Sequence, residues 1–209
     1  MPRTGMLPAC TAQQRPQTYA DCESQKEIVM THNVSAAHPA VRAPSRPVTR
    51  LEVAVDEGYE QFRARYERAV PPLDYERTFD LVAQQAPWSA VIDLAEANGP
   101  LGFMIYWKFD AQPLFGLAGN RARCTEYLMG NHTIAERMYR HDAGALLYAP
   151  LRTTIHESPS GETLFAIDRP SDTVAALGRS DIADVGRELD RKVGTLLRHL
   201  GTSVPDELT

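Results

Sequence analysis

GFMIYWKFD, Gly102–Asp110, opens the stretch of sequence that decides the fold. Its apolar residues alternate, which is typical of a strand that is buried on one side. We expect one set of side chains to face the core: Phe103, Ile105, Trp107 and Phe109. Alternation predicts three further strands downstream, at 122–129, 144–157 and 162–168. The turn SPSG joins the last two strands into a hairpin.

Apolar residues at helical spacing predict five helices, at about 59–70, 75–85, 88–97, 133–141 and 182–200. The short fourth helix begins with TIAE, which has the spacing of a capping box. The long last helix carries one continuous apolar face, which favours packing on a sheet over binding to a membrane.

A strand at 50–55, with alternating Leu51, Val53 and Val55, precedes the first helix. The predicted order is strand, helix, two extra helices, strand, strand, helix, two strands, helix. Strands that are joined by hairpins favour an antiparallel sheet. The sequence therefore predicts an α+β fold, in which a mainly antiparallel sheet is covered by helices on one face.

The domain organisation follows from composition. Residues 1–47 contain many Gln, Ser, Thr and Ala residues and no sustained apolar period, so we expect a disordered leader. A chain of 209 residues with 43% hydrophobic content favours one core. We expect a single α+β domain over 48–201, with a helical insert at about 73–97. Residues 202–209 are expected to form a flexible tail.

The charge and hydropathy of the chain argue against several classes of binding partner. The net charge is -5 and there is no run of Lys and Arg, which argues against nucleic acid. No apolar run reaches the about 20 residues that cross a bilayer, and no secretion signal is visible, so we expect no membrane partner and a cytoplasmic location. Cys10, Cys22 and Cys124 lack metal-ligand spacing, and no His-x-x-x-His pair occurs. We expect no metal and no cofactor.

Four short motifs occur in the order of a known family. They are Phe109-Asp110, Asn131, Pro150 and Ala166-Ile167-Asp168. From Gly102 to about Leu200 the chain resembles domain-of-unknown-function family 302. The resemblance implies a TATA-binding-protein-like fold, often a homodimer, with no settled activity.

The chain also departs from that family pattern. Gly130 and Leu151 stand where the family has cysteine, and His132 stands where it has proline. A thiol-based role therefore cannot be carried over to this sequence.

Candidate catalytic residues gather around the short helix: His132, Tyr139 and His141. A histidine near a carboxylate, here Asp142, can act as a general base near neutral pH. A structural interpretation is also open, in which Asn131 or Thr133 caps the helix and His141 interacts favourably with its C-terminal dipole.

Candidate ligand-binding residues are Tyr106, Asp110, Asn131 and Arg152. Tyr106 belongs to a group of aromatic residues and methionines that either fills the core or lines an apolar ligand cavity between the sheet and the long helix. Asp110 and Arg152 are expected on the uncovered face of the sheet, with Lys108, Glu126 and His156. That face is either a polar pocket or a solvated surface.

Three functions remain open. The first is a homodimeric module that binds a small, partly apolar ligand, with Asn131, His132 and Arg152 at the pocket mouth. The second is an enzyme of proton-transfer chemistry, an isomerase, lyase or cyclase, with His132 or His141 as base and Tyr139 as acid. It requires His132, Tyr139 and Arg152 to converge on one concavity. The third is a structural or partner-binding subunit, whose interface would expose Trp88, Val91 and Ile92.

Overall fold

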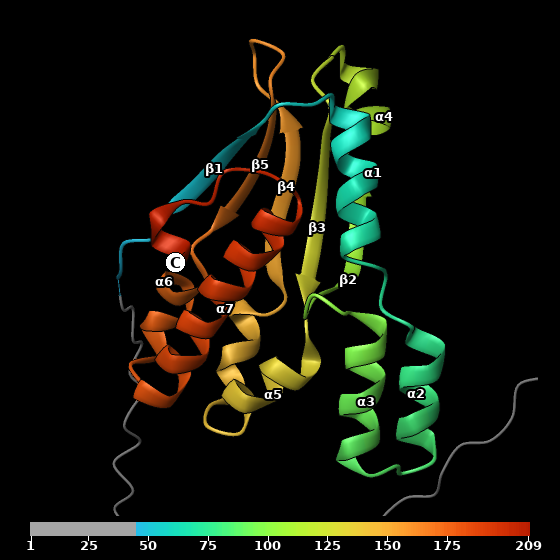
Figure 1. Cartoon of the computed structure of the whole chain (residues 1–209), viewed down its shortest axis with the longest axis vertical. Coiled ribbons are helices and arrows are strands. Elements are labelled where there is room, and N and C mark those ends of the chain that lie inside the picture. The colour runs from blue at the N-terminus through green and yellow to red at the C-terminus, as the bar shows by residue number, and fades with distance from the viewer. Residues whose placement is uncertain (1–44) are drawn as a thin grey trace, which may run out of the picture. The chain divides into compact units, whose positions relative to one another are not determined.

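The computed structural model describes residues 45–209, which belong to one structural unit (Figure 1). Most of the predicted disordered leader, residues 1–44, lies outside the described residues. The fold is α+β, as predicted, and it is built around one five-stranded sheet. No helix of the described part is long and apolar enough to cross a membrane.

The sheet is antiparallel throughout and has the order β1-β5-β4-β3-β2. Its strands are β1 (Arg50–Val55), β2 (Met104–Asp110), β3 (Cys124–Gly130), β4 (Leu151–Glu157) and β5 (Thr163–Asp168). The SPSG turn joins β4 to β5 as predicted. β4 is shorter than expected, because residues Ala143–Tyr148 form a 3-10 helix that Asp142 caps by accepting a hydrogen bond from the Gly144 amide at 2.8 Å.

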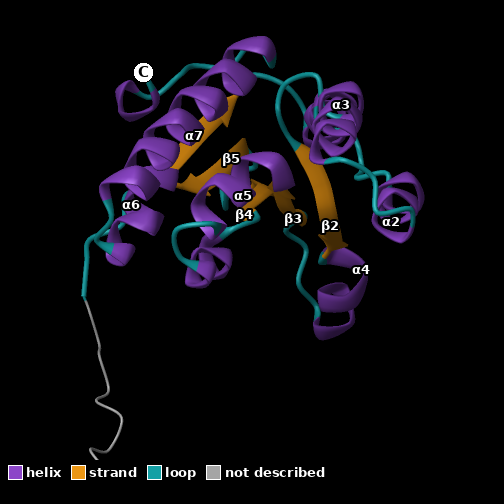
Figure 2. Cartoon of the chain, turned by 90° about the horizontal axis from the view of Figure 1, so that it is seen from below, coloured by secondary structure: helices purple, strands orange, loops and turns teal. Residues whose placement is uncertain are grey.

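Helices cover one face of the sheet (Figures 1 and 2). The covering helices are α1 (Tyr59–Ala69), α5 (His132–Tyr139) and α7 (Ser180–His199); the short α6 (Pro170–Val174) packs on α7. Strand β3 shows the two faces: Tyr127 and Met129 are buried beneath the helices, whereas Glu126 and Leu128 are partly exposed on the other side. The prediction of a sheet covered on one face is confirmed.

The amphipathic helices predicted from the sequence supply much of the core. On α1, Tyr59, Phe62 and Tyr66 are at most 2% exposed, and on α7 the whole predicted stripe is buried. Burying one large apolar side chain stabilises the fold by about 1.5–3 kcal/mol, so these faces hold both helices on the sheet.

Strand β2 differs from its predicted pattern. A β-bulge shifts the pairing register between Ile105 and Trp107. A bulge adds one residue to one strand and so turns the following side chains to the opposite face. Ile105 is therefore buried, but Trp107 is 46% exposed on the uncovered face. The prediction that Trp107 and Phe109 face the core is wrong for this reason.

The same bulge moves the polar residues of β2. Lys108 and Asp110 were expected on the uncovered face, but they lie beneath α1. The Lys108 ammonium is 2.8 Å from the Glu67 carboxylate, and the Asp110 carboxylate is 3.2 Å from the Arg63 guanidinium. Only Glu126, Arg152 and His156 of the expected group share the uncovered face.

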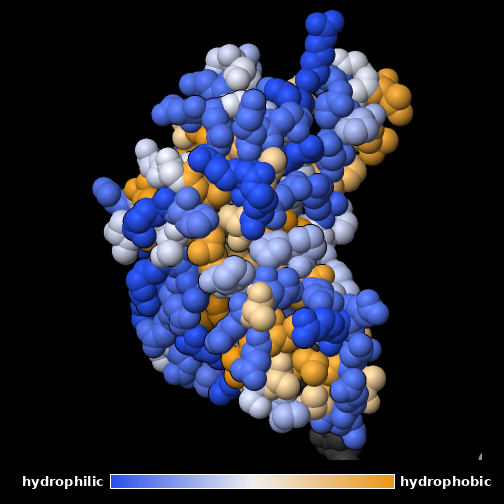
Figure 3. Space-filling model, turned by 45° about the vertical axis from the view of Figure 1, so that its right-hand side comes forward, coloured by the Kyte–Doolittle hydropathy of each residue, from blue (hydrophilic) through white to orange (hydrophobic). Residues whose placement is uncertain are grey.

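The helical insert consists of α2 (Tyr75–Ala83) and α3 (Trp88–Asn98). It is anchored by a small cluster of Leu73, Ala95 and Met104. No residue of α2 is buried. Apolar side chains gather on the surface over this insert and over α4 (Gln112–Phe115) (Figure 3). The most exposed of them on the insert are Tyr75, Phe79, Val82 and Trp88, while Val91 and Ile92 are half-buried.

The residues after α7 lie against that helix. We expected 202–209 to form a flexible tail. In the structure they include a 3-10 turn, Asp206–Leu208, and Leu208 is 1% exposed in the main core. Gly194 provides the space: a Cβ there would lie 2.5 Å from the Leu208 carbonyl oxygen.

Candidate functional site

Helix α5 begins directly at the end of β3, and Asn131 forms the joint. Its Oδ1 accepts hydrogen bonds from the Thr133 amide at 2.9 Å and the Thr133 hydroxyl at 2.7 Å, while its Nδ2 donates to the Gly102 carbonyl at 3.3 Å. Asn131 is therefore the N-cap, as the structural interpretation of this helix predicted for Asn131 or Thr133. The prediction of a capping box from Thr133 to Glu136 is wrong, because Thr133 already lies inside the helix and the Glu136 carboxylate pairs with Arg140.

His132 follows the cap and pairs with Tyr106 of β2. The Tyr106 hydroxyl lies 2.9 Å from the His132 Nδ1. The other ring nitrogen, Nε2, is buried and has no hydrogen-bond partner among the described residues. Burial lowers the pKa of His132, and it raises the pKa of Tyr106 to about 12. Both groups are thus neutral near pH 7.

The tautomer of His132 follows from counting partners. If the Tyr106 hydroxyl donates to Nδ1, its proton and the Nδ1 lone pair are both satisfied, and only the Nε2 proton lacks a partner. The opposite arrangement leaves two groups unsatisfied, the Tyr106 proton and the Nε2 lone pair. We therefore assign the proton to Nε2.

These residues line a cavity of about 160 Å³. It lies where the end of β3 and the start of β4 meet α5 and α7. Most of its lining is aliphatic: Ile134, Ala135 and Met138 of α5, Leu146, Ala149, Pro150 and Leu151 before and in β4, and Leu189 of α7. Three polar residues line the cavity, Tyr106, Asn131 and His132. Their side chains already hydrogen-bond to other groups of the protein, with the exception of the His132 Nε2.

The remaining candidate residues lie elsewhere. Tyr139 is 50% exposed, and the His141 Nδ1 is 3.7 Å from the Asp181 carboxylate at the far end of α5. Arg152 pairs with Glu126 on the uncovered face, and Asp110 pairs with Arg63. None of these four candidates lines the cavity. The structure brings Tyr106, Asn131 and His132 together in the cavity. Arg152 lies with Tyr106 in a separate, shallow hollow on the uncovered face, and Tyr139 lines neither space.

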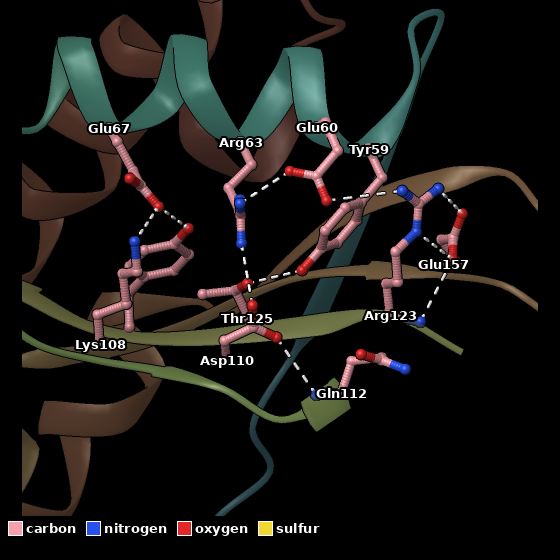
Figure 4. A network of polar contacts seen from close by, with 11 residues as sticks. Tyr59, Glu60, Arg63, Glu67, Lys108, Asp110, Gln112, Arg123, Thr125 and Glu157 are labelled. Atoms are coloured by element: carbon pink, nitrogen blue, oxygen red, sulfur yellow. Dashed lines mark hydrogen bonds and ion pairs between the residues drawn. The ribbon is translucent and has the colours of Figure 1, made fainter. Parts of the chain in front are cut away.

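A second group of polar residues lies between α1 and strands β2 and β3 (Figure 4). There the Glu67 carboxylate accepts hydrogen bonds from Lys108 and from the Tyr127 hydroxyl, both at 2.8 Å. The Tyr59 hydroxyl is 2.6 Å from the Thr125 hydroxyl. Burial and the bond to Glu67 raise the pKa of Tyr127, so its phenol stays neutral. Because the polar groups are partnered, this group fixes α1 on the sheet.

Residues 45–209 contain no candidate metal site, because no group of three or more His, Cys, Asp or Glu side chains is placed to hold an ion. Cys124 on β3 is half-buried, and burial raises the pKa of its thiol. A thiol with a raised pKa is a poor nucleophile at neutral pH.

Comparison with known proteins shows to which family the chain belongs. A family model described as "Domain of unknown function DUF302" matches residues 82–200, more than half of the chain. The chain belongs to the DUF302 family. A crystal structure of an uncharacterized conserved DUF302 protein from Bacillus stearothermophilus has a similar fold, with a TM-score of 0.53 and 13% identity over 72% of this chain and 97% of that chain. No curated protein matches the chain.

The departures of this DUF302 chain from the family pattern coincide with the cavity. Gly130, His132 and Leu151 all line it. A Cβ at Gly130 would lie 3.2 Å from the Pro150 Cβ, so glycine lets the end of β3 approach Pro150 closely. In this DUF302 chain, the two positions at which the resemblance places cysteine therefore contribute no thiol to the cavity.

Sequence reasoning missed most of the cavity wall. Met138 belongs to the group of aromatic residues and methionines for which core and cavity both stayed open. Leu189 was placed on the apolar face of the last helix by its helical period, which does not distinguish a core residue from a cavity residue. Tyr106 was named, but its partner His132 is 26 positions away and no local pattern joins them.

Proposed function

We propose that this DUF302 chain binds one small, uncharged, largely apolar molecule in the cavity beneath α5. The observation that carries the proposal is the lining, which is aliphatic except for three polar residues whose hydrogen bonds are nearly all internal. Ligand pockets combine an apolar wall with a few polar groups in this way. Within residues 45–209, one polar side-chain atom of this wall lacks a hydrogen-bond partner, the His132 Nε2.

The charge of the lining and the volume of the cavity limit the class of ligand that fits. No charged residue of the described part of the chain lines the cavity, so an ion entering it would lose its hydration without a compensating partner. The volume of about 160 Å³ is close to that of an apolar protein cavity of roughly 150 Å³ that holds benzene. A single ring with short substituents matches both limits.

The proton-transfer alternative has less support. It required His132, Tyr139 and Arg152 around one concavity, and only His132 lines this one. A structural role for the insert is also compatible with the exposed Trp88, but the half-burial of Val91 and Ile92 reduces the apolar area that such an interface would have.

The experiment titrates the full chain with toluene and follows thermal unfolding. A ligand that binds only the folded state raises the free energy of unfolding by RT ln(1 + [L]/Kd), and the melting temperature therefore rises with ligand concentration. Ala135→Leu places a larger side chain in the cavity wall, and we expect it to weaken toluene binding at least tenfold. Ala183→Leu, a half-buried position of α7 away from the cavity, is the control and should keep the response.

Two results would count against the proposal. One is the absence of any toluene-dependent shift up to the solubility limit. The other is an unchanged response in Ala135→Leu, which would place the toluene elsewhere on the protein.

A further inference from the structure

A second hollow lies beside the apolar cavity. Its volume is about 460 Å³, within the range of roughly 300–1,000 Å³ that ligand pockets occupy. The two spaces share residues of the segment that leads into β4, Leu146 and Ala149–Leu151, but none of their polar residues. The polar residues of the second hollow include two arginines, Arg46 and Arg152. It therefore differs in chemistry from the apolar cavity.

Arg46 is held in place without an acidic partner. Its guanidinium carbon lies 4.6 Å from the centre of the Tyr148 ring, a cation–π distance. Its Nε and Nη1 are buried and have no hydrogen-bond partner, and no ion pair within residues 45–209 involves Arg46. A partly desolvated guanidinium without an anion costs stability. The side chain is thus oriented and its charge is uncompensated within the described part of the chain.

Arg152 reaches the hollow from the uncovered face of β4. It is 72% exposed and pairs with Glu126. An exposed pair of this kind is weak, and a guanidinium has five donors, so Arg152 can bind a second anion without releasing Glu126. Asp168 also lines the hollow and opposes an anion there. Because Glu126 already compensates Arg152, the cation of the hollow that has no ion-pair partner in residues 45–209 is Arg46.

The rest of the lining is mainly apolar and includes Leu128 and Leu147. Leu147 is 80% exposed and therefore available for contact. A ligand that fits has one negative group for the arginines and an apolar body for the leucines. One guanidinium without an ion-pair partner, that of Arg46, matches a monoanion, and its planar fork matches a carboxylate.

We propose that this hollow binds a small organic carboxylate, with the carboxylate between Arg46 and Arg152 and the apolar body against Leu128 and Leu147. The site is separate from the apolar cavity and does not depend on its function.

The test titrates 4-fluorobenzoate into the full chain at low salt and follows the fluorine resonance by NMR. The neutral and nearly isosteric 4-fluorobenzamide is the matched ligand. We expect the carboxylate to bind at least tenfold more tightly than the amide. Arg46→Gln and Arg152→Gln should each weaken carboxylate binding about tenfold, and Arg46→Lys, which keeps the charge but loses the fork, should weaken it less.

Arg191→Gln is the control variant, because Arg191 is exposed on α7 and does not line the hollow. It should bind 4-fluorobenzoate like the unaltered chain. Circular dichroism and thermal unfolding of each variant establish that a loss of binding is not a loss of fold.

Three results would overturn the proposal. The first is equal binding of the carboxylate and the amide. The second is carboxylate binding that is unchanged in both Arg46→Gln and Arg152→Gln. The third is loss of carboxylate binding in Ala135→Leu with the arginine variants unaffected, which would place the carboxylate in the apolar cavity. Failure of toluene to bind leaves the carboxylate site intact, so the two proposals are tested independently.

Discussion

At the scale of single residues, the start of α5 combines a local and a distant interaction. Asn131 could be recognised from the sequence, because capping depends on neighbours in the chain. The partner of His132 could not, because Tyr106 comes from β2 and the contact exists only once β2 and β3 are paired. The sequence thus indicated where the site begins, and tertiary structure decides which of the candidate residues meet.

The Tyr106–His132 pair gives a prediction at this scale. Tyr106→Phe leaves the buried Nδ1 of His132 without a partner, and we expect a loss of about 1–3 kcal/mol in the free energy of unfolding. In Tyr106→Phe/His132→Leu both polar partners are apolar, so the double variant should lose less than the two single variants added together. Urea unfolding at pH 7.5 measures all three. Strictly additive losses would show that the two side chains are not coupled.

Tyr139→Phe provides the comparison for that cycle. Its ring is 50% exposed, and no hydrogen bond of its hydroxyl is found in residues 45–209. Substitutions at such surface positions change stability by about 0.5 kcal/mol or less. A larger effect there would indicate that the assay responds to aromatic substitution in general.

At the scale of elements, the sequence located all five strands and the five longer helices of the described chain, but not the short α4 and α6 or the faces that β2 presents. Strict alternation put Ile105 and Trp107 on one side. The bulge between them is a backbone feature with no reliable sequence signature, and it separates their environments: Ile105 is 7% exposed and Trp107 is 46% exposed. The stripes of α1 and α7 were predictable because nothing interrupts the helical period.

The bulge can be tested with two substitutions on the same strand. Ile105→Thr puts a hydroxyl into the core and should lower the free energy of unfolding by at least about 2 kcal/mol. Trp107→Thr changes a half-exposed residue to one that also favours strands, so we expect a loss of less than about 1 kcal/mol. Urea unfolding compares the two. Equal losses would mean that both side chains face the core and that β2 alternates without a bulge.

At the scale of the whole molecule, the order of elements sufficed to predict an antiparallel sheet with one covered face, because hairpin-linked strands leave few alternatives. The contact between the last residues and α7 was not predictable. Residues 202–209 contain two isolated apolar residues, Val204 and Leu208, and no period from which burial could be inferred. Their position depends on Gly194, whose missing side chain is meaningful only when Leu208 lies beside it.

Gly194→Ala tests this packing by the sign of its effect. Inside a helix, Ala is favoured over Gly by up to about 1 kcal/mol, so an unpacked α7 would be stabilised by the substitution. In the full chain, a Cβ at position 194 would lie 2.5 Å from the Leu208 carbonyl oxygen and 3.3 Å from a Val204 methyl group. We therefore expect Gly194→Ala to lower the free energy of unfolding of the full chain.

The deciding comparison repeats the substitution in a chain that ends at residue 203. Without Val204 and Leu208 the collision is absent, and Gly194→Ala should now stabilise by up to about 1 kcal/mol. Removing the tail by itself uncovers core residues around Leu208 and should cost about 2 kcal/mol. Urea unfolding of the four proteins gives the coupling between position 194 and the tail. If Gly194→Ala has the same effect in both chain lengths, the last residues do not pack on α7. A change of sign makes them part of the domain core.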